Sequence, residues 1–274
     1  MLSYRHSFHA GNSADVLKHI VLAFCLRYMT QKEKALLCVD THAGAGLFRP
    51  EAGGEWEQGI GRLLQYTKPD CPAPVLDYLD LVRQELYPGS PLIEAKILRR
   101  QDRHVCFELH PRDFADLENV MKKYKCQTRC EDGPAMLKSL LPPPSGRALV
   151  LVDPSWEEKD EFRKIPEDLR NAVKRFPQGT YMIWYPLLLK PKVKLPDNDS
   201  IGKILFDIDG GSRCLAELYN PLAESSIHSP RGFYGSGLVI YNPPWTLNSA
   251  LKKILPFLAG IFPGENEWKL EWID

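Results

Sequence analysis

The stretch from Lys34 to Phe48 constrains the fold of this chain more than any other. Residues 35–39 form a short apolar run, polar before and glycine-rich after, which is typical of a buried parallel strand. The run ends at Asp40, and a tight turn of sequence HAGAG follows at residues 42–46. Glycines there let backbone N–H groups approach a ligand, at the crevice where open α/β sheets bind cofactors. The stretch therefore predicts an α/β fold with a ligand crevice.

The turn alone leaves the kind of ligand open. A nicotinamide-type fingerprint needs a third glycine three residues after Gly46, and that position is Arg49. The spacing Asp-x-x-x-Gly-x-Gly from Asp40 to Gly46 resembles instead the first motif of methyltransferases that use S-adenosylmethionine (SAM). The strand–turn–helix of any α/β protein has a similar pattern, so other segments must decide.

Length and charge set broad limits. The 274 residues suffice for one large α/β domain, and 44% hydrophobic residues predict a normal core. Lys plus Arg equals Asp plus Glu, 35 each, which argues against a protein coated in basic residues but allows a local basic patch that holds nucleic acid. No apolar run is long enough to span a bilayer, and the N-terminus is not a signal peptide. We expect a cytoplasmic protein.

The seven cysteines indicate a reducing compartment. Their number is odd, no C-x-x-C occurs, and Cys38 and Cys106 lie inside apolar runs where thiols act as small core residues. This pattern carries no zinc signature, so we expect no bound metal.

The leader, residues 1–12, is polar, aromatic and cationic, and a helix is expected directly after it. Asn12 is the expected N-cap, with Asp15 in the first turn. Lys18 and His19 sit on or beside the broad apolar face of this helix. Such a pair usually snorkels or caps a surface, but the polar leader before it favours a functional site.

A long detour follows the first strand. The next strand with an acidic end runs to Glu108, 68 residues after Asp40, whereas a plain dinucleotide unit has its acidic ribose ligand roughly 20 residues on. We therefore expect a helical insertion at residues 50–98, with helices at 55–65 and 75–86.

Polar groups at three expected element ends are candidates for cofactor contacts. Ser90 is the expected N-cap of a helix with Pro91 at its first position, and a helix N-terminus aimed at the crevice binds a carboxylate. Glu108 ends the second strand, where a carboxylate accepts ribose hydroxyl protons. Asp132 and Gly133 follow the third strand and could meet an adenine amino group, although an ordinary Asp-Gly turn fits equally well.

The later part of the chain reads as more strands and helices. We expect strands at 147–153, 180–185, 215–219 and 238–241, helices at 167–176 and 201–207, and a Ser/Gly-rich linker at 220–237.

The tetrapeptide Asp153-Pro154-Ser155-Trp156 follows the clearest strand and suggests chemistry on an exocyclic adenine amine. The lone pair of such an amine is delocalised into the ring. The Asp153 carboxylate and the Pro154 backbone carbonyl can accept both amine protons and draw the lone pair towards an incoming methyl group. Trp156 is expected to stack on the base, a contact worth roughly 1–3 kcal/mol. A base in a duplex must first be flipped out, and attack on a sulfonium needs positioning and exclusion of water.

The tetrapeptide resembles the [Asp/Asn/Ser]-Pro-Pro-[aromatic] motif of adenine-N6 methyltransferases and departs from it at Ser155. Asn242-Pro243-Pro244-Trp245 matches the motif better, but it follows the last strand of an expected hairpin. If that strand is antiparallel, its end points away from the crevice. We prefer Asp153, because ligands lie at the carboxyl ends of parallel strands. The other segment is then a rigid turn with Trp245 packed on the core.

Several segments together resemble the RlmJ family, bacterial enzymes that methylate N6 of one adenosine in 23S ribosomal RNA. They are residues 3–12, 15–19, 40–46, 87–92, 108–111 and 242–245. The resemblance implies a single class I SAM-dependent methyltransferase domain over 1–274. Its Rossmann-like sheet would have seven strands, helices on both faces and a small helical insertion. It also implies a monomer that acts on naked or immature 23S rRNA.

The resemblance also implies roles for individual residues. Asp153 would be the catalytic acceptor, and Tyr4, His6 and Lys18 would shape the substrate side. Together with Gly44 of the turn, the residues implied to bind SAM are His19, His42, Ser90, Glu108, Asp132 and Gly133. Candidate phosphate contacts are Arg5, Lys122, Lys123, Lys190, Lys192 and Lys194, each of which is more often a solvated charge. The competing interpretations are a DNA adenine-N6 methyltransferase and a binding module without catalysis.

Overall fold

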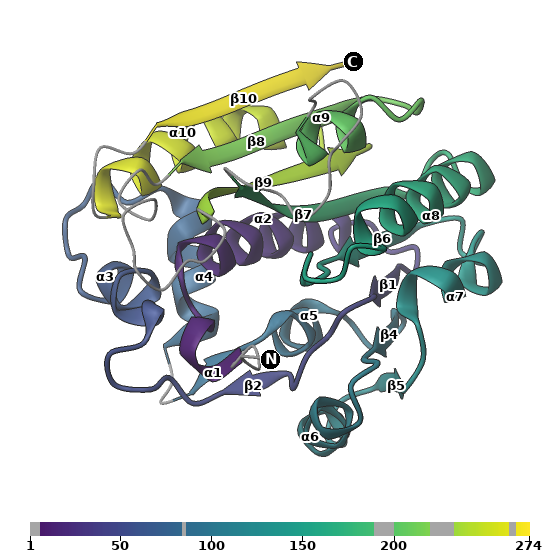
Figure 1. The fold of residues 1–274 in the computed structure, drawn as a ribbon, viewed down its shortest axis with the longest axis horizontal. Helices are drawn as coiled ribbons and strands as arrows, with labels where there is room; N and C mark the ends of the chain where they lie inside the picture. The colour runs from purple at the N-terminus through teal and green to yellow at the C-terminus, as the bar shows by residue number, and fades with distance from the viewer. Residues whose placement is uncertain (1–5, 84–85, 189–199, 220–232, 263–266) are drawn as a thin grey trace.

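A computed structural model describes residues 6–83, 86–188, 200–219, 233–262 and 267–274. Its centre is an eight-stranded, mostly parallel sheet in the order β10-β8-β9-β7-β6-β1-β4-β5 (Figure 1). The parallel strands are β1 (Leu37–Asp40), β4 (Arg103–Phe107), β5 (Cys126–Arg129), β6 (Ala148–Val152) and β7 (Thr180–Leu188). The antiparallel strands are β8 (Arg213–Tyr219), β9 (Phe233–Tyr241) and β10 (Trp268–Ile273). The expected seven strands become eight because β10 pairs with β8.

Helices cover both faces of this sheet. One core lies beneath α2 (Ser13–Met29), α4 (Ala73–Val82) and α10 (Leu247–Ile261), and it contains the inward side chains Cys38, Leu149 and Ile240 of the sheet. The core of the opposite face lies beneath α7 (Gly133–Leu140), α8 (Glu161–Arg175) and α9 (Ile201–Phe206). The strands alternate their side chains between these two cores, as strand geometry requires.

The expected insertion contains several short elements. They are a 3₁₀ turn (Glu55–Glu57), α3 (Ile60–Leu64), α4, β3 (Tyr87–Pro88) and α5 (Ser90–Ile97). β3 pairs with β2 (Leu47–Phe48), which closes the base of the insertion. Residues of α3 and α4 belong to the same core as α2 and α10, so the insertion extends the main hydrophobic core. The remaining elements are α1 (His6–His9) and α6 (Pro111–Met121), which lies against β5.

The central helix α2 begins as the sequence predicted. Asn12 is the N-cap, and its Oδ1 accepts a hydrogen bond from the backbone N–H of Asp15 at 3.0 Å. The Asp15 carboxylate in turn accepts from the N–H of Gly11 at 2.9 Å. These bonds satisfy helix-end donors that would otherwise lack partners.

Four departures from the expected element boundaries are the largest. The helix expected at 55–65 is interrupted at Gly59. The backbone passes so close to Gly11 there that a Cβ atom would lie 2.2 Å from the Gly11 carbonyl oxygen, which leaves no room for a side chain. The helix expected at 75–86 ends at Val82, and the one expected at 167–176 already begins at Glu161. The linker expected to reach 237 ends earlier, since β9 starts at Phe233. None of the helices in the described ranges is long and apolar enough to cross a membrane.

Candidate functional site

The carboxyl ends of three adjacent parallel strands place Asp40, Glu108 and Asp153 at one edge of the sheet, namely the edge formed by the ends of these strands. β1 pairs with β4 on one side and with β6 on the other, so that Asp40 lies opposite Cys106 and Leu151. The first N–H groups after β1 continue this pairing: that of Thr41 donates to the Leu151 carbonyl at 3.0 Å. The three acids therefore lie at the edge where open α/β sheets bind ligands.

The glycine-rich turn has the conformation that glycine allows. Gly44 and Gly46 adopt positive φ angles of 57° and 77°. The N–H of Gly44 donates to Glu108 Oε2 at 2.8 Å, and the N–H of His110 donates to Glu108 Oε1 at 2.7 Å. A carboxylate offers about four lone-pair sites, so Glu108 retains acceptor capacity beside the turn. This arrangement fits the recognition of ribose hydroxyl groups.

Asp40 joins the turn to the insertion. Its buried carboxylate accepts from the Ser90 hydroxyl at 2.7 Å and from the N–H of His42 at 3.1 Å. Burial, together with the nearby charge of Glu94, raises the pKa of Asp40 well above its ordinary value. Ser90 was expected to be the N-cap of α5, but Gly89 holds that position and Ser90 is the first helical residue. The expectation was wrong by one residue because the Ser90 side chain bonds Asp40 instead of its own helix.

Lys18 connects the central helix to the Asp153 turn. Its Nζ donates to Asp153 Oδ2 at 2.6 Å and to Asp15 Oδ1 at 2.7 Å, and its side chain is only 8% exposed. Burial opposes the charge of Lys18, but the two carboxylates outweigh it and raise its pKa. Lys18 is therefore a buried cation between two acids and does not snorkel to the surface.

His19 lies deeper, beneath the insertion. Its Nδ1 is 2.8 Å from the Tyr87 hydroxyl oxygen, which is 2.8 Å from the hydroxyl of Tyr78. Burial lowers the pKa of His19 to about 3, so the imidazole is neutral at physiological pH. Burial likewise lowers the pKa of His42 in the turn to about 4. Both histidines can thus act as uncharged hydrogen-bonding groups.

Asp132 and Gly133 form the beginning of α7. Asp132 is the N-cap, and its Oδ1 accepts from the N–H of Ala135 at 3.3 Å. A Cβ atom on Gly133 would lie 2.3 Å from the carbonyl oxygen of Thr41, so the loops after β1 and β5 touch here. This segment therefore both caps α7 and lies beside the loop that follows β1.

Trp156 does not face the crevice. It adopts a positive φ of 53°, has no exposed surface, and donates its indole N–H to the Trp184 carbonyl at 3.0 Å. Its ring lies against Phe162, with centroids 5.2 Å apart. The structure contradicts the expected stacking on a base, because the turn directs the ring into the core and leaves no face for a nucleotide. Ser155, where the motif prefers proline, accepts from the N–H of Glu157 at 3.2 Å and so supports the turn.

The second tetrapeptide lies at the opposite edge of the sheet. β9 is antiparallel to β7, and its last residue, Tyr241, lies opposite Tyr181 near the start of β7. The Asn242 amide donates to the carbonyls of Pro177 and Gly179 at 2.6 and 2.7 Å. Our preference for Asp153 as the residue at the crevice edge agrees with this strand direction. The expected packing of Trp245 is wrong, because this ring is 77% exposed.

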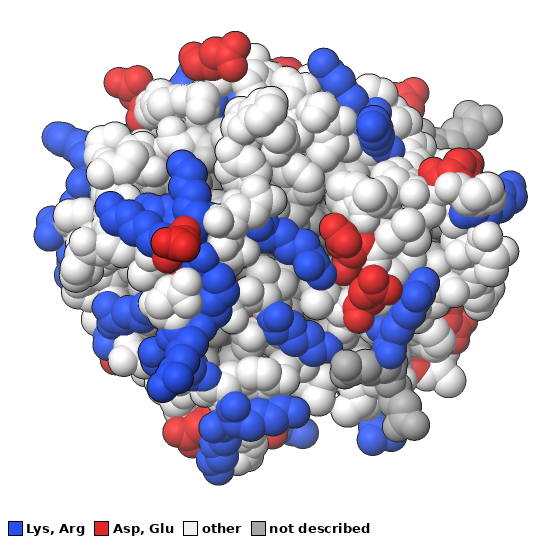
Figure 2. Space-filling model, turned by 180° about the vertical axis from the view of Figure 1, so that it is seen from behind, with Lys and Arg blue, Asp and Glu red and all other residues white. Residues whose placement is uncertain are grey.

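Part of the expected substrate side cannot be placed. Tyr4, Arg5 and the three lysines between 190 and 194 lie outside the described residues, and of His6 only the backbone is described, at the start of α1. Lys122 and Lys123 are exposed directly after α6. Zero net charge does not mean an even distribution: Figure 2 shows Lys and Arg gathered over the left half of the face seen there, with few acidic residues among them.

Two important contacts were not predicted from the sequence. Asp15 was noted only as a first-turn residue, although its spacing from Lys18 is that of an i, i+3 ion pair. Tyr87 was noted only within a motif, and no local pattern could show that it bonds His19, which is 68 residues away.

Comparisons with known proteins indicate the family. Residues 33–274 match the family described as RsmJ, ribosomal RNA large subunit methyltransferase D, RlmJ. The chain is 40% identical over 290 residues to ribosomal RNA large subunit methyltransferase J of Haemophilus influenzae, covering 100% of this chain and 99% of the relative. It is 37% identical over 289 residues to the protein of that name in Escherichia coli, with the same coverage. A solved structure from Legionella pneumophila is 34% identical, with a TM-score of 0.83, and the match covers 96% of this chain and 98% of that one.

Proposed function

Because the chain belongs to the RlmJ family of ribosomal RNA large subunit methyltransferases, we propose that it transfers the methyl group of SAM to N6 of an adenosine in 23S rRNA. One observation carries the choice of catalytic residue: Lys18 holds Asp153 at the edge of the sheet that also carries the glycine-rich turn. An acceptor for an amine and a crevice for a methyl donor therefore lie on neighbouring strands.

Asp153 is proposed to accept a hydrogen bond from one of the two amine N–H groups. Lys18 fixes the orientation of the carboxylate through the 2.6 Å contact with Oδ2, and Asp15 fixes Lys18 in turn. The Pro154 carbonyl is the second proposed acceptor. With both protons held, the amine lone pair turns out of conjugation with the ring and towards the methyl carbon, and preorganised polar groups of this kind act without reorganisation.

SAM supplies an electrophilic methyl group on a sulfonium when it is bound. Glu108 is proposed to accept the ribose hydroxyl protons, and Asp132 to accept from the adenine amine at the start of α7. His42 and Gly44 line the turn between them. Spare acceptor capacity on Glu108 and positive φ angles in the turn support the fit of this chain to the group.

Ser90 and His19 need a modified role. The Ser90 hydroxyl is bound to Asp40, so the proposed contact is between the N-terminus of α5 and the carboxylate of SAM. His19 uses Nδ1 for Tyr87, and its Nε2 is the atom proposed to face SAM. Gly133 is proposed to contribute close backbone approach rather than a polar contact.

The base itself needs a partner other than Trp156, which is buried. We assign this part to the leader, where Tyr4 and His6 are the proposed substrate residues. The protein is further proposed to act in the cytoplasm as a monomer on naked or immature 23S rRNA.

Mass spectrometry of 23S rRNA from cells with and without this gene tests the proposal. One N6-methyladenosine should disappear without the gene and return with the wild-type copy, but not with Asp153→Ala. The purified Asp153→Ala protein should still bind SAM, and undiminished transfer by it would end the assignment. Transfer from labelled SAM to unmodified rRNA and to DNA, measured side by side, separates the proposed substrate from the DNA alternative.

A further inference from the structure

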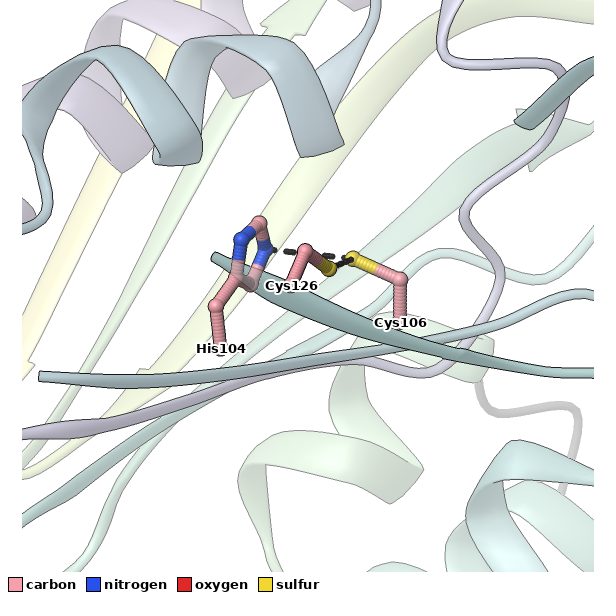
Figure 3. A group of neighbouring side chains, drawn as sticks. All are labelled: His104, Cys106 and Cys126. Atoms are coloured by element: carbon pink, nitrogen blue, oxygen red, sulfur yellow. Dashed lines mark hydrogen bonds between the residues drawn. The ribbon is translucent and has the colours of Figure 1, made fainter. Parts of the chain in front are cut away.

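A second buried polar cluster lies beneath helix α5, on the α2 side of the sheet. His104 and Cys106 come from β4 and point to the same side of the sheet, because they are two residues apart. Cys126 comes from the neighbouring strand β5, where it lies opposite His104. Figure 3 shows the imidazole and the two thiols pointing toward one another. Glu94 reaches the group from α5, and the SAM site proposed above uses none of these side chains.

Three ligand-type atoms of this cluster lie close together, and Glu94 adjoins them through His104. His104 Nε2 is 2.6 Å from Glu94 Oε2 and 3.1 Å from Cys106 Sγ, and Cys126 Sγ is 3.4 Å from Cys106 Sγ. The His104, Cys106 and Cys126 atoms all lie within 4.8 Å of one another. Glu94 and Cys106 are fully buried, His104 is 3% exposed, and Cys126 is partly buried.

Hydrogen bonds alone do not satisfy this group. A ring nitrogen carries at most one proton, but Nε2 of His104 has both the carboxylate of Glu94 and the sulfur of Cys106 within bonding distance. The other carboxylate oxygen, Glu94 Oε1, is buried and makes no hydrogen bond of ordinary geometry among the described residues, although the Cys38 thiol lies within 4.8 Å of this carboxylate. Such a poorly satisfied buried oxygen calls for an explanation, and a bound ion is a recognised one.

We propose that this cluster binds one zinc ion through His104 Nε2, the sulfurs of Cys106 and Cys126, and the carboxylate of Glu94. Two thiolates, an imidazole and a carboxylate are a donor set that suits zinc, with bonds of about 2.3 Å to sulfur and about 2.0–2.2 Å to nitrogen and oxygen. Tetrahedral geometry then separates neighbouring ligand atoms by about 3.3–3.8 Å. The sulfur–sulfur distance already fits this range, whereas the Glu94 carboxylate, which groups with His104 and Cys38 and not with the two sulfurs, must shift towards them to become the fourth ligand.

The surroundings favour a structural role. β5 is the edge strand of the sheet, and the partly buried Cys126 gives an ion a route into the otherwise closed group. Four protein ligands leave no open position for substrate, so the ion would pin α5 to β4 and β5 behind the crevice.

Cobalt uptake by the full-length chain tests the proposal. The protein is purified with a reductant, stripped with a chelator and titrated with Co²⁺ as a spectroscopic substitute for zinc. We expect one Co²⁺ per chain, a thiolate-to-cobalt charge-transfer band, tetrahedral ligand-field bands, and displacement of Co²⁺ by Zn²⁺. Elemental analysis of protein isolated without chelator should find zinc.

Two cysteine variants make the test specific. Cys126→Ser should weaken metal binding by more than about 100-fold and reduce the charge-transfer band. Cys130→Ser, at an exposed cysteine four residues further along the chain, should bind like wild type. Circular dichroism checks that each variant is folded. No stoichiometric uptake by folded wild-type protein, an equally intense band in folded Cys126→Ser, or a disulfide between Cys106 and Cys126 in its place would overturn the proposal. The readout is metal binding, so the outcome is independent of methyl transfer.

Discussion

The chain contains two similar tetrapeptides whose fates are opposite. Asp153-Pro154-Ser155-Trp156 follows β6, and Asn242-Pro243-Pro244-Trp245 follows β9. Each contains a residue with positive φ, Trp156 at 53° and Asn242 at 46°. The first keeps its acid beside Lys18 and buries its tryptophan, whereas the second bonds its amide to backbone carbonyls and exposes its tryptophan.

The difference comes from strand direction. β6 runs parallel to β1, so its end lies beside the glycine-rich turn, whereas β9 runs antiparallel to β7 and ends at the other edge. The better match to the motif is therefore at the wrong edge for the crevice. The comparison also shows that an aromatic residue at the fourth position has no fixed role, since one ring is core and the other is surface.

Exchanging the acid and the amide should give the largest effect. Asp153→Asn removes the charge that Lys18 orients and replaces one of the two acceptor oxygens by an NH₂ donor, so we expect kcat to fall on the order of 10²-fold while SAM binding persists. Asn242→Asp, at the other edge, should change kcat by less than about 3-fold. Both are measured with labelled SAM on unmodified rRNA below the unfolding temperature. Similar losses in both variants would remove the distinction between the two turns.

Truncating the two tryptophans should separate core from surface. Trp156→Ala leaves a large cavity beside Phe162, and we expect it to lower the free energy of unfolding by about 3–5 kcal/mol. Trp245→Ala removes an exposed ring and should change it by less than about 0.5 kcal/mol. Urea unfolding measures both values. An undisturbed Trp156→Ala protein with lost activity would instead return Trp156 to a catalytic role.

Removing the buried cation should destabilise the crevice edge. Lys18→Met leaves the carboxylates of Asp15 and Asp153 without their shared partner, and we expect a loss of about 3 kcal/mol. Lys252→Met on the exposed side of α10 is the matched control, with a change within about 0.5 kcal/mol. Equal stability of the two variants by urea unfolding would show that the Lys18 ion pairs contribute nothing.

The smallest expected effect is on the pH dependence of the free energy of unfolding. The folded pKa of His19, about 3, is below its unfolded value, so the unfolded chain binds a proton that the native chain refuses between pH 6.5 and 3. Stability should therefore fall as the pH drops from 6.5 to 5, by about 2 kcal/mol from His19. His42 contributes in the same direction. The His19→Asn protein should show a flatter pH dependence, whereas His110→Gln, at an exposed histidine, should keep the wild-type slope.

Local signals in the sequence sufficed for part of the site. Strand β1, the glycine turn with its positive φ angles, the Asn12 cap and the acid at the end of β4 were all predicted. Each depends on residues close together in the chain. Ser90 was misplaced by one position because its partner, Asp40, is 50 residues away. The cluster around His104 was missed for the same reason, since its side chains come from three separate elements.

Local patterns in the chain were enough to identify the strands, the glycine turn and the acids that end three of the strands. Those outcomes follow from backbone sterics and the burial of apolar side chains, which act over a few residues. Three features depend on the folded arrangement: which tetrapeptide lies beside the glycine turn, the burial of Trp156 against the exposure of Trp245, and the position of Lys18 between two carboxylates. Those outcomes depend on strand order and direction, because the contacts join residues that the chain keeps far apart.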